Sequence, residues 1–488
     1  MPVARVQSAL AATATAVWRS STLVSWVSLL VRIGGLAVLL PLVIVRFSVE
    51  EVLIWQMLSS LTLMVSYIDF GFGPTFTRLV AFGRGGGTMA GIQQPKAPRA
   101  EPSDDASSQS LDLAAILGTQ RVVYCSLALA ATAIAAVAGT AALWCPIALL
   151  DNPAEGWVAW GLTLASAVLA LLTTLYSSIV IGFDRIVELR RVEIVVGAFQ
   201  LLVASLIIAS GLGLVALIVC YLAANLAMFC LSAWLARRHT RHLAQRFEMR
   251  VFQAVWPGAW RSGVGILMAS GTVQASGLLF AQLASPAASA SYLIVLRLVS
   301  VLGQLANAPF YTKLPRLSVL RAKGDTAAVR TLAAKGFRLT AWTYVVGALS
   351  LVWLGPPLLA MIKSSVPMPP ADLTILLVLS QYIERYSATH LQIYSTTNHI
   401  VWHLAAGITG LLMIVLMLVL VPLIGPVGVP TAMIVGYLAF YAGYASHLSL
   451  KSMSVSRLTF DGRTVFAPTA ILLLGLGAWL TFHHVARP

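Results

Sequence analysis

Charged residues are scarce in this sequence. Asp, Glu, Lys and Arg make up only 10% of its 488 residues, whereas a soluble domain carries roughly 25%. Hydrophobic residues account for 59% of the chain. This balance excludes an ordinary soluble protein. Because about twenty apolar residues cross a bilayer, the many long apolar runs predict an all-α integral membrane protein.

The apolar runs fall into two sets of six, followed by one more near the end of the chain. The predicted spans are residues 23–45, 52–82 (with a break), 114–142, 156–181, 192–211, 213–236, 260–284, 289–312, 338–362, 372–396, 400–421, 425–447 and 465–483. Residues 83–110 are rich in Gly, Pro, Ser and Asp, and we expect them to form a disordered cytoplasmic loop. The expected domains are a cytoplasmic N-terminus at 1–22, a first lobe at 23–236, a cytoplasmic linker at 237–256, a second lobe at 257–447 and the extra span 465–483.

Cysteines and catalytic motifs are also scarce. The four cysteines lack metal-ligand spacing and are interpreted as small buried hydrophobes; they are Cys125, Cys145, Cys220 and Cys230. The chain has neither a phosphate-cradling P-loop nor a nucleophile elbow, so ATP hydrolysis and ester chemistry have no evident site. We therefore expect no enzyme activity, no cofactor and no bound metal.

The chain carries a net charge of +15, which raises the question of a nucleic-acid partner. Most of the 32 Lys and Arg residues fall beside the segments that face the cytoplasm if the N-terminus lies inside. This distribution is the positive-inside bias of membrane proteins, and the basic loops lack interleaved aromatic residues. We therefore expect a cytoplasmic N-terminus and no nucleic-acid partner.

A short string occurs twice. Pro74-Thr75-Phe76-Thr77-Arg78-Leu79 returns as Pro309-Phe310-Tyr311-Thr312-Lys313-Leu314, and each copy closes the second span of a six-span half. An even number of spans per half means that both halves enter the membrane from the same side. The repeat is thus parallel, and it predicts two six-helix lobes around a central cavity that holds the substrate path.

Two arginines lie deep within predicted spans, Arg32 in the first and Arg297 in the eighth. A charge at such a depth costs roughly 2.5–3.5 kcal/mol on insertion scales and usually marks a pathway. Both side chains are candidates to face the cavity and bind an anionic group such as a phosphate. The alternative is that each satisfies backbone carbonyls or pairs with a carboxylate. Gln274, Gln304 and Asn307 are further candidates for substrate binding.

Span 372–396 contains Glu384 and Arg385 about halfway across. Adjacent helical residues point about 100° apart, so we expect that these two side chains do not simply neutralise each other. They are candidates for a gating ion pair or a proton-coupling carboxylate, with a structural lock between helices as the equal alternative.

Asp69 opens the segment Asp69-Phe70-Gly71-Phe72-Gly73-Pro74. Two glycines and a proline are expected to break the helix near its cytoplasmic end and to free backbone groups. We interpret Asp69 mainly as a polar cap on the kinked helix, which is compatible with a hinge or coupling role. The repeat aligns Asp69 with Gln304.

Three segments resemble a known family. Asp69-Phe70-Gly71-Phe72-Gly73-Pro74, followed by Arg78-Leu79-Val80-Ala81, resembles a segment typical of polysaccharide-biosynthesis flippases, as does Arg121-Val122-Val123-Tyr124. The loop Pro315–Asp325 resembles one shared more widely by the multidrug/oligosaccharidyl-lipid/polysaccharide exporters. The resemblance implies two six-helix lobes that form a V-shaped cavity and alternate access. It also implies cationic residues facing that cavity, a placement that Arg32 and Arg297 fit.

The expected function is therefore translocation of undecaprenyl-pyrophosphate-linked oligosaccharide across the bacterial inner membrane. Membrane lipids and polysaccharide polymerase and export proteins are the expected partners. One alternative is a cation-coupled multidrug exporter of the same superfamily, which would need carboxylates or aromatic residues in the cavity. Another is a membrane polysaccharide polymerase or ligase, which generally needs a large periplasmic loop, whereas the outer loops here are short.

Overall fold

The computed structural model describes residues 21–84, 112–311, 313–397 and 401–485, and these residues form helices with no strand. The expected N-terminal segment 1–22 and loop 83–110 therefore lie almost wholly outside the described residues. Nine helices in the described part are long and apolar enough to cross a membrane, or ten when α19 (Arg457–Thr464) and α20 (Phe466–Val485) count together as one bent span. The all-α, multi-pass membrane fold is confirmed.

The helix count is lower than the thirteen predicted spans, in part because Trp402–Met453 counts once among the described helices. A straight helix of its 52 residues would be about 78 Å long, far more than the roughly 30 Å hydrocarbon core. The chain instead reverses at Gly425, which has φ +67°, and α16 (Trp402–Ile424) packs against α17 (Gly428–Gly436). Two membrane passes therefore fit this segment, as the sequence predicts.

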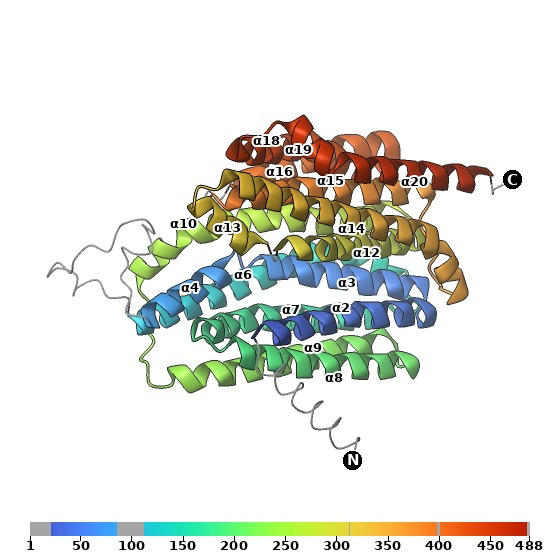
Figure 1. The fold of residues 1–488 in the computed structure, drawn as a ribbon. Coiled ribbons are helices and arrows are strands. Elements are labelled where there is room, and N and C mark those ends of the chain that lie inside the picture. The colour runs from blue at the N-terminus through green and yellow to red at the C-terminus, as the bar shows by residue number, and fades with distance from the viewer. Residues whose placement is uncertain (1–20, 85–111, 312, 398–400, 486–488) are drawn as a thin grey trace, which may run out of the picture. The chain divides into compact units, whose positions relative to one another are not determined.

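The described chain divides into two compact units, and residues 48–60 belong to the second unit although they precede most of the first. Unit 1 comprises residues 1–47 and 61–263. In it α2 packs on α8, and α7 packs on α4, α6 and α9 (Figure 1). Its helices are α2 (Ser21–Arg46), the end of α3 (Val49–Tyr67), α4 (Phe72–Arg84), α6 (Leu113–Ala148), α7 (Pro153–Gly182), α8 (Ile186–Ala209), α9 (Gly213–Thr240) and most of α10 (Met249–Ile266).

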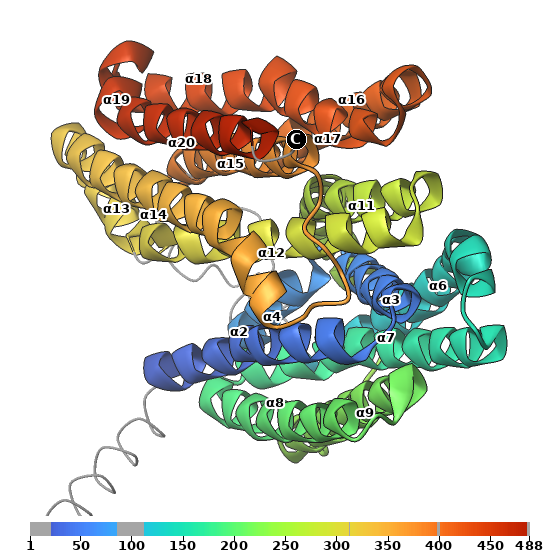
Figure 2. The ribbon, with the colours of Figure 1, turned by 90° about the vertical axis from the view of Figure 1, so that its right-hand side faces the viewer.

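Unit 2 comprises residues 48–60 and 264–488. Its core is made by large apolar and aromatic side chains of α12, α14, α15 and α18, among which Phe310, Phe337 and Tyr344 are almost fully buried. Figure 2 shows α15, α18 and α20 running alongside one another. The helices are most of α3, the end of α10, η2 (Leu267–Gly271), α11 (Thr272–Leu283), α12 (Pro286–Tyr311), α13 (Leu314–Ala322), α14 (Thr326–Met361), α15 (Ala371–Ser395), α16 (Trp402–Ile424), η3 (Gly425–Val427), α17 (Gly428–Gly436), η4 (Tyr437–Tyr441), α18 (Ala442–Met453), α19 (Arg457–Thr464) and α20 (Phe466–Val485).

The last helix belongs to the core of unit 2. Leu472, Leu476 and Trp479 of α20 are buried in the core cluster. The hydroxyls of Thr469 on α20 and Tyr382 on α15 are hydrogen-bonded at 2.7 Å. The helix that lies outside the sequence repeat is thus part of the folded unit.

The cysteines differ from expectation. Cys220 is buried, as predicted, whereas Cys125, Cys145 and Cys230 are exposed on their helices. A small apolar side chain that faces lipid has no cost of exposure to water, so burial is not required of it. The expectation of burial is wrong for these three residues.

The segment between α9 and α10 is fastened to the start of α6. Arg246 donates its backbone N–H to the Ala114 carbonyl at 3.3 Å, and its guanidinium pairs with Asp112 at 2.9 Å. Thr119 exchanges hydrogen bonds with the Glu248 backbone at 3.0 and 3.3 Å. This backbone contact is possible because residue 118 is glycine: a Cβ there would lie 2.2–2.5 Å from backbone atoms of Arg246.

We expect Gly118→Ala to lower the stability of the protein by about 1–3 kcal/mol, because the added methyl group forces the two backbones apart. Gly161→Ala on α7 is a matched control, since a Cβ there meets nothing within 4 Å and alanine favours the helix. Thermal unfolding of the purified protein in detergent compares the two. Equal midpoints for the two variants would contradict the close packing at Gly118.

Candidate functional site

Arg297 is held inside unit 2 by two neutral side chains of α3. Its Nη1 donates to Gln56 Oε1 at 3.0 Å, and its guanidinium lies over the Trp55 ring, 5.1 Å from the centroid. Both partners are only 2% exposed, while Arg297 itself is half-buried. Neither partner carries a charge, so these contacts orient the guanidinium without neutralising it.

The same two residues bring further hydrogen-bond donors to the site. Among the described residues, neither Trp55 Nε1 nor Gln56 Nε2 has a hydrogen-bond acceptor, although both atoms are buried. An unmet buried N–H is costly and usually marks an absent partner such as water or ligand. Sequence reasoning missed both residues, because neither is charged and their helix belongs to the other half of the sequence repeat.

The remaining predicted substrate-binding residues are scattered. Gln304 is exposed and lies two turns beyond Arg297 on the same face of α12, since seven residues turn a helix by about 700°. Asn307 is fully buried and faces α15, where Thr389 Oγ1 donates to its Oδ1 at 3.4 Å. Gln274 is half-buried on α11. Arg32 lies on α2, but its side chain is outside the described residues.

Glu384 and Arg385 bond directly to each other. The Arg385 guanidinium donates to Glu384 Oε2 through Nε and Nη2, and the two side chains are 14% and 20% exposed, respectively. The expectation that adjacent residues do not neutralise each other is therefore wrong. Long side chains bend across the helical offset of 100° when burial makes an unpaired charge costly. Arg385 also packs over Gly303 of α12, where a Cβ would lie 3.2 Å from its Cδ.

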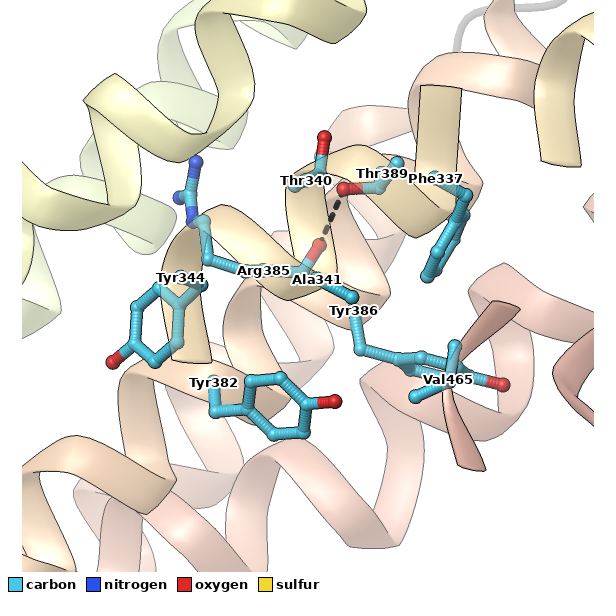
Figure 3. A pocket seen from close by; sticks show the side chains of 9 residues that line it. All are labelled: Phe337, Thr340, Ala341, Tyr344, Tyr382, Arg385, Tyr386, Thr389 and Val465. Carbon is cyan, nitrogen blue, oxygen red and sulfur yellow. Dashed lines mark hydrogen bonds between the residues drawn. The ribbon is translucent and has the colours of Figure 1, made fainter. Parts of the chain in front are cut away.

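A small cavity of about 10 Å³ lies next to this pair, about enough for one water molecule. Figure 3 shows the Arg385 guanidinium and the Tyr386 ring pointing to opposite sides of α15. The cavity is lined by Phe337, Thr340, Ala341 and Tyr344 of α14, by Tyr382, Arg385, Tyr386 and Thr389 of α15, and by Val465 between α19 and α20.

Asp69 caps α4 at the break that the sequence predicts. The chain turns through Phe70 (φ +49°) and Gly71 (φ +70°), and Asp69 Oδ2 accepts the Gly73 N–H at 3.1 Å. Tyr124 of α6 donates its hydroxyl to Asp69 Oδ1. The interpretation as a helix cap is confirmed, and Tyr124 is an additional partner that the spacing could not reveal.

The second copy of the repeated string has a different local structure. Gln304, the residue aligned with Asp69, lies within α12, which continues through Pro309 to Tyr311. The first copy breaks three residues before its proline, since α4 begins at Phe72 and the turn lies at Asp69–Gly71. Glycine at position 71 permits the turn, whereas the aligned position is Ala306, which favours helix.

No family model matches the sequence, and no curated protein is significantly similar to it. Solved structures do share its fold. An inward-facing multidrug resistance transporter of the MATE family, in the MOP superfamily, has a TM-score of 0.65 at 9% identity, over 86% of this chain and 94% of that chain.

Two further structures extend the likeness. The Vibrio cholerae MATE transporter VcmN in the bent form gives a TM-score of 0.52 at 14% identity, over 92% of this chain and 99% of that one. The lipid II flippase MurJ in an inward closed conformation gives 0.50 at 13% identity, over 91% and 98%. The chain has the fold of these transporters.

We expect Asp69→Ala to lower stability by about 1–2 kcal/mol, because it removes the cap of α4, whereas Asp69→Asn keeps an acceptor for Gly73 and loses less. Thermal unfolding measures both variants, with the exposed Asp151→Ala as control. A normal melting temperature for Asp69→Ala would contradict the capping role. Normal stability of Asp69→Asn with loss of transport would show that the carboxylate charge has a role beyond the cap.

Removing one member of the Glu384–Arg385 pair should destabilise the protein more than removing both, because a single change leaves a poorly solvated charge. We expect Glu384→Gln or Arg385→Gln to cost about 1–3 kcal/mol and the double variant to recover part of this loss. Thermal unfolding of the four proteins gives the coupling free energy. Additive effects would mean that the pair is not coupled, contrary to the structure.

Proposed function

We propose that this protein is a flippase that moves undecaprenyl-pyrophosphate-linked oligosaccharide units across the bacterial inner membrane by alternating access. The fold likeness to exporters and to a lipid II flippase supports a transport function. The observation that carries the choice of an anionic lipid-linked substrate is the arrangement of Arg297 with Trp55 and Gln56.

The chemistry of this arrangement suits a pyrophosphate. A guanidinium presents a planar set of N–H donors that match phosphate oxygens, and it keeps its charge when water is removed. Trp55 Nε1 and Gln56 Nε2 supply two more buried donors beside it, both without an acceptor among the described residues. A site of several donors around a fixed cation favours an anionic group over a cationic one.

A cation-coupled multidrug exporter is the second candidate, favoured by the TM-score of 0.65 to a multidrug resistance transporter. Such a protein needs carboxylates or aromatic residues in its cavity to hold cationic drugs, and the Trp55 ring is already covered by Arg297. The two candidate carboxylates of this chain are already engaged, since Glu384 pairs with Arg385 and Asp69 bonds to Gly73 and Tyr124. These contacts favour the flippase.

The proposal also covers the orientation of the protein in the membrane and its partners. The positive-inside distribution of Lys and Arg supports a cytoplasmic N-terminus, so the substrate would enter from the leaflet where lipid-linked sugars are assembled. The proposed partners are membrane lipids and the polymerase and export proteins that use the translocated unit. We propose neither a nucleic-acid partner nor a catalytic role.

We expect Arg297→Ala to reduce flipping at least about tenfold, because a charged hydrogen-bond donor to the substrate is worth roughly 1.5–3 kcal/mol. The flipping rate of Arg297→Lys should lie between those of the wild type and Arg297→Ala, since lysine keeps the charge and loses the planar donor set. The measurement is leaflet exposure of fluorescent undecaprenyl-pyrophosphate oligosaccharide in proteoliposomes. We expect a similar loss for Arg32→Ala.

The matched control is Arg316→Ala, which removes an exposed arginine of α13 and should flip at the wild-type rate. Equal protein content and melting temperature must accompany each comparison. Wild-type flipping by Arg297→Ala would remove the proposed phosphate site. Efflux of a cationic dye without flipping of the lipid would favour the multidrug exporter instead.

A further inference from the structure

His390 is an ionisable residue of unit 2 that the preceding sites do not use. It is 0% exposed on α15, and its ring lies among three aromatic rings: Phe337 of α14 at 4.7 Å, Tyr386 at 4.6 Å and Phe460 of α19 at 5.7 Å between centroids. Among the described residues, neither ring nitrogen has a hydrogen-bond partner. A buried polar group without a partner is unfavourable, so this ring needs one.

Asp461 of α19 presents a matching acceptor. Its Oδ2 accepts from the Tyr386 hydroxyl at 2.9 Å and from Arg457 Nε at 3.3 Å. Its Oδ1 is buried, has no hydrogen-bond donor among the described residues, and lies 3.8 Å from His390 Nε2. Asp461 Oδ1 therefore faces His390 Nε2, and neither atom has a hydrogen-bond partner among the described residues. The distance between them exceeds the length of a charge-assisted hydrogen bond by about 1 Å.

The charged groups around His390 and Asp461 balance each other when no proton is bound. Arg457 balances Asp461 when His390 is neutral, and its side chain is 59% exposed, so it links the buried carboxylate to the outside of the unit. The other groups near the pair are uncharged or titrate far from neutral pH: Phe337 of α14, Tyr382 and Tyr386 of α15, and Ser446 of α18.

We propose that His390 and Asp461 form a proton-binding site. Before a proton binds, His390 Nε2 and Asp461 Oδ1 face each other without a hydrogen bond. The cluster of His390, Asp461 and Arg457 then has no net charge. On binding, Nε2 takes one proton from water, forms an N–H bond and donates it to Asp461 Oδ1. The cluster then carries one positive charge, and release of the proton to water reverses the step.

The position of the site determines which neighbouring groups proton binding affects. His390 lies six residues after Glu384 on α15, about 9 Å along the helix, and both Arg385 and Tyr386 line the one-water cavity. Proton binding adds a charge on the helix that holds the Glu384–Arg385 pair and tightens its link to α19. Chains of Asp and His inside membranes often serve as proton relays.

This inference extends the proposed function, because proton binding would make transport depend on pH, but its test needs no substrate. Full-length protein with ¹⁵N-labelled histidines, in lipid nanodiscs, is titrated by NMR from about pH 5 to about pH 9, the range around the ordinary histidine pKa. His390→Gln identifies the signal, and His447→Gln, which removes an exposed histidine of α18, is the control.

We expect the signal lost in His390→Gln to titrate in the wild-type protein. In Asp461→Asn its midpoint should fall by about one pH unit or more, because the opposite charge is removed. If His390→Gln does not fold, the signal that shifts in both Asp461→Asn and Tyr386→Phe identifies His390. A His390 signal that does not change with pH, or an unchanged midpoint in Asp461→Asn, would overturn the proposal.

A second measurement distinguishes failure of the proton-site proposal from failure of the flippase proposal. The pH profile of flipping should follow the His390 midpoint in the wild-type protein and become flat in His390→Gln. A titrating His390 in a protein that flips no lipid-linked oligosaccharide at any pH would contradict the flippase and leave the proton site in place. A profile that is identical in wild type and His390→Gln would contradict a role of the site in transport.

Discussion

An ionisable side chain within a membrane-spanning helix must be satisfied by its own protein neighbours, because the hydrocarbon offers none. Two solutions occur on the long helices of unit 2. Glu384 and Arg385 neutralise each other. Arg297 donates to Gln56 and lies over the Trp55 ring, and neither of these two side chains carries a charge.

Sequence periodicity and hydropathy were sufficient for the fold class, because long apolar runs have few alternatives to transmembrane helices. The break at Asp69–Gly71 could also be predicted, since two glycines and a proline leave backbone groups that an adjacent carboxylate satisfies. The partner Tyr124 could not, because it lies on another helix at a distance that the sequence does not encode.

The Glu384–Arg385 pairing was mispredicted because the angular offset of adjacent residues says little about flexible side chains several bonds long. Trp55 and Gln56 were missed for another reason. They precede the break in their helix and belong to unit 2, although the sequence repeat assigns them to the first lobe. His390 gave no signal of its own, because its partner Asp461 lies outside the predicted spans.

Lipid-linked repeat units in a strain that lacks this gene test most directly whether the protein moves an anionic lipid-linked oligosaccharide. The measured quantity is the amount of these units that periplasmic glycosidase cannot reach. We expect these units to accumulate in the cytoplasmic leaflet and the wild-type gene to restore their export. Normal export in the deletion strain, with a new sensitivity to cationic dyes, would contradict this expectation.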